Sequence, residues 1–522
     1  MADKLTPQQS MAVHDRGGML LVSAAAGSGK TKVLVDRLLT YLTDPKNPAN
    51  MDEFLIITYT KAAASELRGK IAAKLTERIT QQPENRHLQK QMQRLFLTKI
   101  STVHGFCGDL LREYAYKLDI GADFRVADEN ECREIRERVL TDLLDRAYEN
   151  AGEDPDFRAF VDTQGLGRTD MLVPEILEKV YNSALCHLDP EGWLQKCVDA
   201  AQVESLEDVS QTSWGAYLLD DLHGYLDAQI HVMRQCIEAA ECCDGMEKAV
   251  INLRDTVYQL ERLRNCTTWD ETVSARAIDY GRLTFPRKNP DPELTERIKA
   301  ARGACKKNLE KKLRGFTDDS AQIFRDFAQS ASGTRGLISL VKQFDKAYAN
   351  EKKSRRCLDF SDLEHKTLDL LLGRSRSGPT AVAAEIGRRF REILEDEYQD
   401  SNGVQDAIFS ALSREKNNCF MVGDVKQSIY QFRLADPGIF LEKYHRYLPA
   451  EEAEAGQGRK VLLSHNFRSG GEVIEAVNDV FRDCMSDAVG DLYYGEEEML
   501  RRVVAAINGK MKVGCTGCGY CM

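Results

Sequence analysis

Hydrophobic residues follow two different periods along the 522-residue chain. Met19–Ser23 is a short apolar run, which predicts a buried strand, and the apolar positions after Lys30 recur at helical spacing. This alternation of strands and helices continues over residues 1–115 and implies a parallel α/β sheet. Much later in the chain, Ile393 and Leu394 predict the end of a further strand of the same kind.

Residues from 116 to about 355 have the pattern of helices that each bury one apolar stripe. One stripe comprises Ile135, Val139, Leu140, Leu143, Leu144 and Tyr148. A second stripe comprises Leu253, Val257, Leu260 and Leu263. The pattern predicts a large helical segment, after which the chain re-enters the sheet by about Leu358. We expect the polar stretch that ends at Lys460 to be a linker.

Length and composition narrow the class of protein. A chain of this length has room for about three domains, and a hydrophobic content of 43% is ample for a packed core. No apolar run approaches the ~20 residues of a membrane span, and the polar start of the sequence does not resemble a secretion signal. Most of the 15 cysteines are scattered. We therefore expect reduced thiols in a cytoplasmic protein that has no membrane partner.

The net charge of −11 does not by itself indicate nucleic-acid binding. It does not exclude such binding either, because a groove needs only local positive charge. Residues 282–314 are rich in Lys and Arg. A DNA-binding surface and a solvated helix face both fit this stretch, and the two interpretations stay open.

A glycine-rich segment follows the first predicted strand and precedes the first predicted helix. Its residues are Ala24, Ala25, Ala26, Gly27, Ser28, Gly29, Lys30 and Thr31. Small residues let backbone N–H groups surround phosphate oxygens, and the helix N-terminus adds a positive dipole. Lys30 would reach the β- and γ-phosphates of ATP, and the Thr31 hydroxyl would bind Mg²⁺. Ala24 stands where the general phosphate-loop pattern has glycine.

An acidic pair follows the later predicted strand. Asp396 would hold Mg²⁺ through water, and Glu397 would act as the general base for the attacking water. An Asp-Glu pair alone is weak evidence, but here it opens the segment "DEYQD", which ends at Asp400. The phosphate loop and this pair together predict a nucleotide-hydrolysing site.

These segments resemble, in order, the motifs of superfamily 1 DNA helicases of the UvrD/Rep type. The matching stretches are "LTPQQSMAV", "AAAGSGKT", "FLIITYTKAAASELRGKI", "ISTVHGFC", "DEYQD", "MVGDVKQSIYQFRLADP" and "LLSHNFRS". The chain is similar in particular to AddA, the helicase–nuclease subunit of bacterial double-strand-break repair complexes. In this family's variant of the phosphate loop, Ala replaces the first glycine. The resemblance implies a P-loop RecA-like parallel sheet, a large all-helical insertion and the start of a second RecA-like lobe.

The resemblance also implies domain boundaries. The first motor domain, 1A, would comprise 1–115 and 356–450, with the helical insertion 1B at 116–355. The second motor domain, 2A, would start at 459–500, and 501–522 would form a cysteine-rich tail.

Four further residues of the ATP site follow from the resemblance. Gln9 would read the adenine, and Phe467 would stack on the adenine ring. Gln427 would sense the γ-phosphate, and Arg468 would reach across from the second lobe to neutralise charge that develops on it.

Candidate DNA contacts lie in two places. Tyr430 and Phe432 alternate along "SIYQFR", so in an extended segment both rings point to one side and offer faces on which bases stack. Two core aromatic residues would give the same pattern. Thr58, Thr60, Thr102 and His104 sit at predicted strand ends, where their donors would hold DNA phosphates. His104 alone also fits a buried core histidine.

The implied function is an ATP-dependent 3′-5′ DNA helicase or translocase subunit that acts in double-strand-break repair and recombination. It would move on single-stranded DNA, contact duplex DNA and pair with an AddB-like nuclease subunit. The resemblance stops after Leu500, before the expected motifs V and VI, which makes an ATP- and DNA-binding fragment without turnover the alternative.

The last residues suggest a third possibility. Cys515, Cys518 and Cys521 have the spacing of three ligands of an iron–sulfur cluster, whose fourth cysteine is missing. A segment foreign to the family, a genuine metal-binding tail and inert cysteines are the three interpretations. An iron–sulfur electron-transfer protein is accordingly the third hypothesis for the whole chain.

Overall fold

The computed structural model describes residues 5–16, 18–118, 120–164, 172–201, 206–286, 291–413, 418–430 and 435–485, together with 495, 499–502, 504–507 and 510–513. The chain forms two compact units. The first comprises 1–142, 178–191 and 344–522, and the second comprises 143–177 and 192–343.

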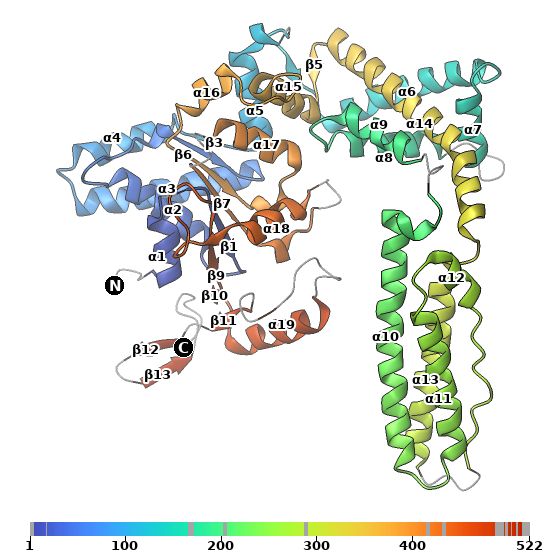
Figure 1. Cartoon of the computed structure of the whole chain (residues 1–522). Coiled ribbons are helices and arrows are strands. Elements are labelled where there is room, and N and C mark those ends of the chain that lie inside the picture. Colours follow the sequence, from blue (N-terminus) through green and yellow to red (C-terminus); the bar gives the residue numbers. More distant parts are fainter. Residues whose placement is uncertain are drawn as a thin grey trace. The chain divides into compact units, whose positions relative to one another are not determined.

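The first unit contains a parallel sheet in the described part of the chain. It has seven strands in the order β3-β2-β6-β7-β1-β9-β8 (Figure 1). The strands are β1 (Leu20–Ala24), β2 (Phe54–Ile57), β3 (Lys99–Ser101), β6 (Glu392–Asp396), β7 (Cys419–Gly423), β8 (Leu448–Pro449) and β9 (Arg459–Leu463). Strands from both ends of the chain alternate in this order, so the sheet is complete only when the chain returns from the helical segment. The mixed α/β fold class that we predicted is confirmed.

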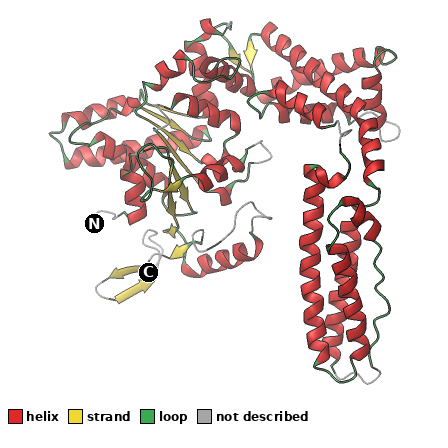
Figure 2. Cartoon of the chain, in the orientation of Figure 1, coloured by secondary structure: helices red, strands yellow, loops and turns green. Residues whose placement is uncertain are grey.

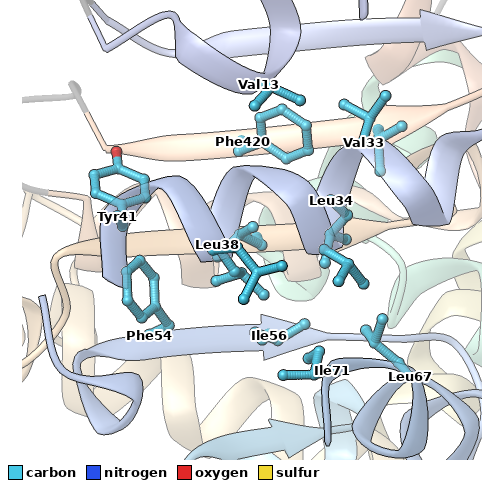
Figure 3. Close-up of a cluster of buried hydrophobic side chains, with 14 of the residues drawn as sticks. Val13, Val33, Leu34, Leu38, Tyr41, Phe54, Ile56, Leu67, Ile71 and Phe420 are labelled. Carbon is cyan, nitrogen blue, oxygen red and sulfur yellow. The ribbon is translucent and has the colours of Figure 1, made fainter. Parts of the chain in front are cut away.

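Helices cover both faces of the sheet. One face carries α1 (Pro7–His14), α2 (Lys30–Leu42), α3 (Lys61–Gln81) and α4 (Arg86–Arg94). The other carries α5 (Val103–Glu113), α15 (Phe360–Leu372), α16 (Ala381–Gly387), α17 (Gly403–Leu412) and α18 (Pro437–Arg446). Strand residues alternate between the two cores: Leu20 and Val22 face the first, and Leu21 faces the second. Figure 3 shows the first core, in which Leu34 and Leu38 of α2 lie close to Ile56 of β2.

Strand β9 differs from the sequence-based expectation. It pairs with β1 over Leu20↔Arg459 to Ala24↔Leu463, and β8 pairs with it on the other side. The polar stretch before β9 is thus an excursion between two neighbouring strands of the first sheet, and the predicted start of domain 2A at 459 falls inside this sheet. The physical reason is that Val461 and Leu463 are buried in the core that α2 also fills. The remaining domain boundaries stay a prediction.

Smaller elements complete this unit. They are β4 (Arg125–Val126), β5 (Cys357–Leu358), β10 (His465–Asn466), α19 (Gly471–Cys484), β11 (Arg501–Arg502), β12 (Val504–Ile507) and β13 (Lys510–Val513). β4 pairs with β5, β10 with β11, and β12 with β13.

The segment from α6 to α14 is helical (Figure 2). Its helices are α6 (Glu129–Glu149), α7 (Pro155–Gln164), α8 (Val173–Ala184), α9 (Pro190–Ala200), α10 (Ser213–Glu241), α11 (Glu247–Arg264), α12 (Trp269–Ala275), α13 (Pro292–Lys312) and α14 (Ser320–Ser354). The second unit has its own core, built mainly from α10, α11, α12 and α13. In the basic stretch, α13 buries Ile298, Cys305 and Leu309 in that core, so this stretch is an amphipathic helix whose use by DNA is untested.

Candidate functional site

The carboxyl ends of the parallel strands place the predicted motifs along one edge of the sheet. β1 leads into the glycine-rich loop, and its neighbour β7 ends at Gly423. β6, next to β7, ends at Asp396. Ligands of open parallel sheets bind outside this edge. Segments far apart in the sequence therefore meet where a ligand would bind.

The glycine-rich loop has the backbone of a phosphate cradle. Gly27 has φ +71°, and a Cβ there would come within 3.0 Å of Arg468 Cβ and within 2.9 Å of the Asn466 amide atoms. Gly29, with φ 89°, caps the N-terminus of α2. The Ser28 hydroxyl is buried and has no hydrogen-bond partner among the described residues. A donor-rich loop at a helix N-terminus, with an unpaired buried hydroxyl, fits a phosphate group.

Ala24 ends strand β1, and Ala25 follows it with a hydrogen bond to β9. Ala24 is the last residue of β1 and is fully buried, and the Ala25 N–H donates to the Leu463 carbonyl oxygen at 3.0 Å. Ala24, which stands where the general pattern has glycine, therefore has a packing role, and a small side chain suffices there. Ala26 is exposed at the tip of the loop.

Lys30 and Glu397 are in direct contact. Lys30 Nζ lies 2.9 Å from Glu397 Oε2, although the two residues are far apart in the sequence. Glu397 has φ 55°, in the left-handed region that a non-glycine residue occupies only at a cost of about 1–3 kcal/mol. The carboxylate of this strained residue contacts Lys30, the first residue of α2. The two halves of the predicted hydrolytic site are thus within reach of one bound triphosphate.

The acidic residues beside this pair have raised pKa values. Burial raises the pKa of Asp396 to about 6, Glu397 adds to the increase, and Lys30 opposes it. Burial and Glu397 likewise raise the pKa of Asp400 to about 6. Carboxylates crowded in this way bind a divalent cation readily, because the cation relieves their repulsion. Thr31 and Asp396 are the residues that would hold Mg²⁺, which would neutralise phosphate charge during hydrolysis.

Gln399 and Asp424 connect the acidic segment to the next strand. Gln399 Nε2 donates to Glu397 Oε2 at 2.9 Å, and Gln399 Oε1 accepts from the Asp424 N–H at 2.9 Å. Asp424 in turn accepts from Gln427 Nε2 at 2.7 Å. Gln427, the predicted γ-phosphate sensor, is therefore linked to Glu397 through two residues that we did not single out from the sequence. Only the position of Gln399 inside "DEYQD" could have indicated it.

The segment after β9 closes over the loop. Asn466 Nδ2 donates to the Ala26 carbonyl oxygen at 2.8 Å, and the Phe467 N–H donates to the Gly27 carbonyl oxygen at 2.9 Å. Asn466 Oδ1 also accepts from the Arg468 N–H at 2.8 Å. The predicted partners Phe467 and Arg468 thus lie against the loop. Sequence reasoning missed Asn466, which precedes them in "NFRS".

Gln9 lies beside the phosphate loop and is hydrogen-bonded to the protein itself. Its Nε2 donates to the Ser28 carbonyl oxygen at 2.9 Å, and its Oε1 accepts from the Thr6 N–H at 3.0 Å. In this structure Gln9 ties α1 to the phosphate loop. Its predicted contact with adenine is untested.

A cavity of about 740 Å³ lies beside the same edge, within the first unit. Thr58, Thr102 and His104 line it, as does Tyr59, whose ring stacks on Tyr430 with centroids 4.7 Å apart. This brings the predicted DNA-contact segments to one place. Tyr59 was missed, although it lies between Thr58 and Thr60, which the sequence analysis singled out.

The polar groups predicted to contact DNA are partly used by the protein itself. Thr58 is 1% exposed, and its hydroxyl donates to the Thr60 carbonyl oxygen at 3.1 Å. The hydroxyls of Thr60 and Thr102 cap α3 and α5. His104 Nε2 lies 3.1 Å from Glu364 Oε1, and its ring lies 4.5 Å from that of Phe360. Contacts of these residues with DNA stay a prediction.

Two sets of predicted residues cannot be placed. Phe432 and the tail cysteines Cys515, Cys518 and Cys521 lie outside the described residues. Within the described ranges, no group of three His, Cys, Asp or Glu side chains could hold a metal ion. The same ranges contain no helix long and apolar enough to span a membrane.

The parallel sheet, the glycine-rich loop and the facing acidic pair define a P-loop nucleotide-binding protein with a RecA-like core. Residues 5–448 match the UvrD/REP helicase N-terminal domain, and the chain belongs to that family. The predicted relationship to UvrD/Rep-type helicases is thereby confirmed.

Individual relatives agree with this family. The chain is 35% identical over 516 residues to AddA of Clostridium perfringens (strain 13), an ATP-dependent helicase/nuclease subunit, covering 96% of this chain and 40% of the relative. It is 37% identical over 514 residues to the protein of the same kind in Pelotomaculum thermopropionicum, with the same shares. For that of Moorella thermoacetica the identity is 37% over 501 residues, covering 94% of this chain and 35% of the relative. The chain thus spans about 40% of the length of the first of these relatives.

Proposed function

We propose that this chain carries the ATP-binding motor domain of an ATP-dependent DNA translocase of the AddA helicase/nuclease type. The observation that supports this most is the contact of Lys30 Nζ with Glu397 Oε2 at 2.9 Å, at the carboxyl edge of a parallel sheet. A phosphate-binding lysine and a candidate general base that touch each other can act on one bound triphosphate.

The proposed hydrolysis uses the residues in the following roles. Lys30 turns from Glu397 to the β- and γ-phosphates, while Thr31 and Asp396 hold Mg²⁺. Glu397 accepts a proton from the attacking water as its oxygen bonds to the γ-phosphorus and the bond to the β–γ bridging oxygen breaks. Arg468 stabilises the charge on the transferred phosphoryl group.

The work proposed for this hydrolysis is movement along single-stranded DNA in the 3′-5′ direction. The cavity lined by Thr58, Tyr59, Thr102 and His104 lies near the ATP residues and would hold the strand. The names of the relatives support a helicase that acts together with a nuclease. We further propose a role in double-strand-break repair, in which the partner would be an AddB-like subunit.

The test combines nucleotide binding, phosphate release and direction of movement. We expect the chain to bind Mg·ATP, and Lys30→Ala to weaken this binding by about 10–100-fold. Glu397→Gln should keep nucleotide binding and lower DNA-stimulated phosphate release by about 10²–10⁴-fold, the usual contribution of a general base. Displacement of streptavidin from the 5′ end but not the 3′ end of an oligonucleotide would support 3′-5′ movement.

Other outcomes would contradict the proposal at different levels. Nucleotide binding without phosphate release would favour the binding-only alternative. Turnover that survives Glu397→Gln would refute the role of Glu397. An unchanged affinity for Mg·ATP in Lys30→Ala would refute the site itself.

A further inference from the structure

Asp400 closes the segment "DEYQD", and the proposed hydrolysis gives it no role. The residue is 7% exposed and lies in the wall of the 740 Å³ cavity, together with Tyr59 and His104. Its Oδ1 atom is buried and has no hydrogen-bond partner among the described residues. A buried acceptor without a partner costs about 1–3 kcal/mol, so a ligand that supplies a donor gains that energy.

The other oxygen of Asp400 points to the ATP site. Asp400 Oδ2 accepts from Gln399 Nε2 at 3.4 Å, and the same nitrogen donates to Glu397 Oε2 at 2.9 Å. Gln399 is 2% exposed and is fixed at its other end by the Asp424 N–H. One immobilised carboxamide is therefore shared by the proposed general base and by the carboxylate that faces the cavity.

We propose that Asp400 is a positioning residue that couples occupancy of the cavity to Glu397 through Gln399. A nucleobase whose N–H group binds Asp400 Oδ1 weakens the hydrogen bond between Asp400 and Gln399, because the charge of the carboxylate is then satisfied from the cavity side. A phosphate cannot do this, since it has no donor at neutral pH and would be repelled by the carboxylate. The base edge of the strand is thus the group that Asp400 recognises.

Nucleotide acts on the same carboxamide from the other side. When Lys30 turns to the phosphates, Glu397 loses its 2.9 Å partner and depends more on Gln399. DNA and nucleotide each change the hydrogen bonds of the Gln399 side-chain amide. The affinities for the two ligands are therefore linked, and the linkage is reciprocal.

The experiment measures this linkage in the whole chain. The dissociation constant of a labelled (dC)₁₂ oligonucleotide is determined by fluorescence anisotropy with and without saturating Mg·AMP-PNP, and the ratio of the two constants is the coupling factor. We expect the wild-type factor to differ from 1 by about fivefold or more, the lower end of typical coupling. Asp400→Asn should bring it to within twofold of 1.

The matched control is Glu129→Gln. Glu129 lines the same cavity, but its carboxylate pairs with Arg136 at 2.7 Å rather than with Gln399. The same chemical change there should leave the coupling factor as in the wild type, whereas a general effect of cavity charge would lower it in both variants. Asp400→Ser, which removes the carboxylate and its charge, provides a second test if Asp400→Asn does not fold.

The inference rests on the proposed function, and the outcomes separate the two. A wild-type chain that binds both ligands without linkage, or an Asp400→Asn variant with the wild-type factor, overturns the inference and leaves the proposed function standing. A wild-type chain that binds neither ligand overturns both. An equal loss of coupling in Glu129→Gln also overturns it.

Discussion

Helix α2 contacts strand β6 and the residue just beyond it through two ion pairs that differ in burial and in the number of their hydrogen bonds. Lys30, the first residue of α2, pairs with Glu397 just beyond the carboxyl end of β6. Arg37, two turns further along α2, pairs with Glu392, the first residue of β6. The same helix and the same strand therefore allow a direct comparison between a buried ion pair and a partly exposed one.

The Arg37–Glu392 pair is fully satisfied. Arg37 donates from Nε to Glu392 Oε2 at 2.9 Å and from a terminal nitrogen to Oε1 at 2.5 Å. Its other terminal nitrogen donates to the Ala12 carbonyl oxygen, and the Tyr41 hydroxyl donates to Glu392 at 3.0 Å. The side chains are 1% and 4% exposed. Burial acts to lower the pKa of Arg37, but Glu392 outweighs it and raises the pKa overall.

The Lys30–Glu397 pair is more exposed and has fewer hydrogen bonds. Its side chains are 14% and 39% exposed and share a single contact. The Glu397 backbone is strained, and two neighbouring carboxylates, Asp396 and Asp400, have raised pKa values. The comparison teaches that charge at one end of β6 is buried and fully paired, while charge at the other end is only partly paired and lies on a strained backbone, as we expect of a ligand site.

The largest expected effect comes from breaking the satisfied pair. Glu392→Gln leaves the Arg37 charge buried without its counter-charge, and such losses cost about 3–5 kcal/mol. Urea unfolding of the variant should show a decrease of this size in the free energy of unfolding. Nucleotide affinity per folded molecule should be unchanged, because Glu392 lies at the opposite end of the strand. A loss below about 1 kcal/mol would mean that the pair does not stabilise the fold as described.

The second effect concerns ligand binding instead of stability. Lys30→Ala should weaken Mg·ATP binding by about 10–100-fold, since hydrogen bonds to charged groups contribute about 1.5–3 kcal/mol. Isothermal titration calorimetry gives the affinity. Lys32→Ala is the matched control, because Lys32 lies two residues along the same helix and pairs with Asp36 at 3.2 Å. Equal losses in both variants would show that only the net charge of the helix matters.

The sequence was sufficient to predict one of these two sites. The glycine-rich loop and the acidic pair have local patterns, so Lys30, Asp396 and Glu397 could be found without a structure. The Arg37–Glu392 pair has no such pattern: Arg37 occupies an apolar position of its helix, and its partner is brought near only by the order of the strands. Pairing between distant segments is what the sequence could not supply.

The same limit explains the other differences. Polar residues before β9 suggested a linker, but β9 buries Val461 and Leu463 beside β1. Composition could not show this, since an inserted excursion and a linker are both polar. Asn466 and Gln399 were missed because an amide side chain gains its role only from the hydrogen-bonding groups that the fold brings near it.

A third effect follows from the raised pKa of Asp400. Because this pKa rises from 3.8 to about 6 on folding, the native state binds protons more tightly than the unfolded state, and stability falls as the pH rises through this range. Asp400→Asn removes this loss. Above pH 7 the variant should be more stable than the wild type by up to about 3 kcal/mol, and the difference should fall below about 1 kcal/mol near pH 4.

Urea unfolding at pH 4 and pH 7.5 measures this difference. The amide keeps an acceptor for Gln399, so packing should be little changed. A gain in stability that is the same at both pH values would attribute it to packing and not to the charge. If the gain appears mainly at pH 7.5, removal of the Asp400 charge stabilises the carboxyl end of β6, whereas removal of the Glu392 charge destabilises the other end.

The smallest expected effect on stability comes from the more exposed ion pair between Lys32 and Asp36. Lys32 and Asp36 are 34% and 19% exposed and lie one turn apart on α2, between the two pairs compared above. Water screens such a pair, so Lys32→Ala should change the free energy of unfolding by only about 0.3–0.5 kcal/mol, and less in 1 M salt. Thermal unfolding at low and high salt measures this. A loss near that of Glu392→Gln would mean that burial does not set the strength of ion pairs along α2, and the contrast between the two ends of β6 would then need another cause.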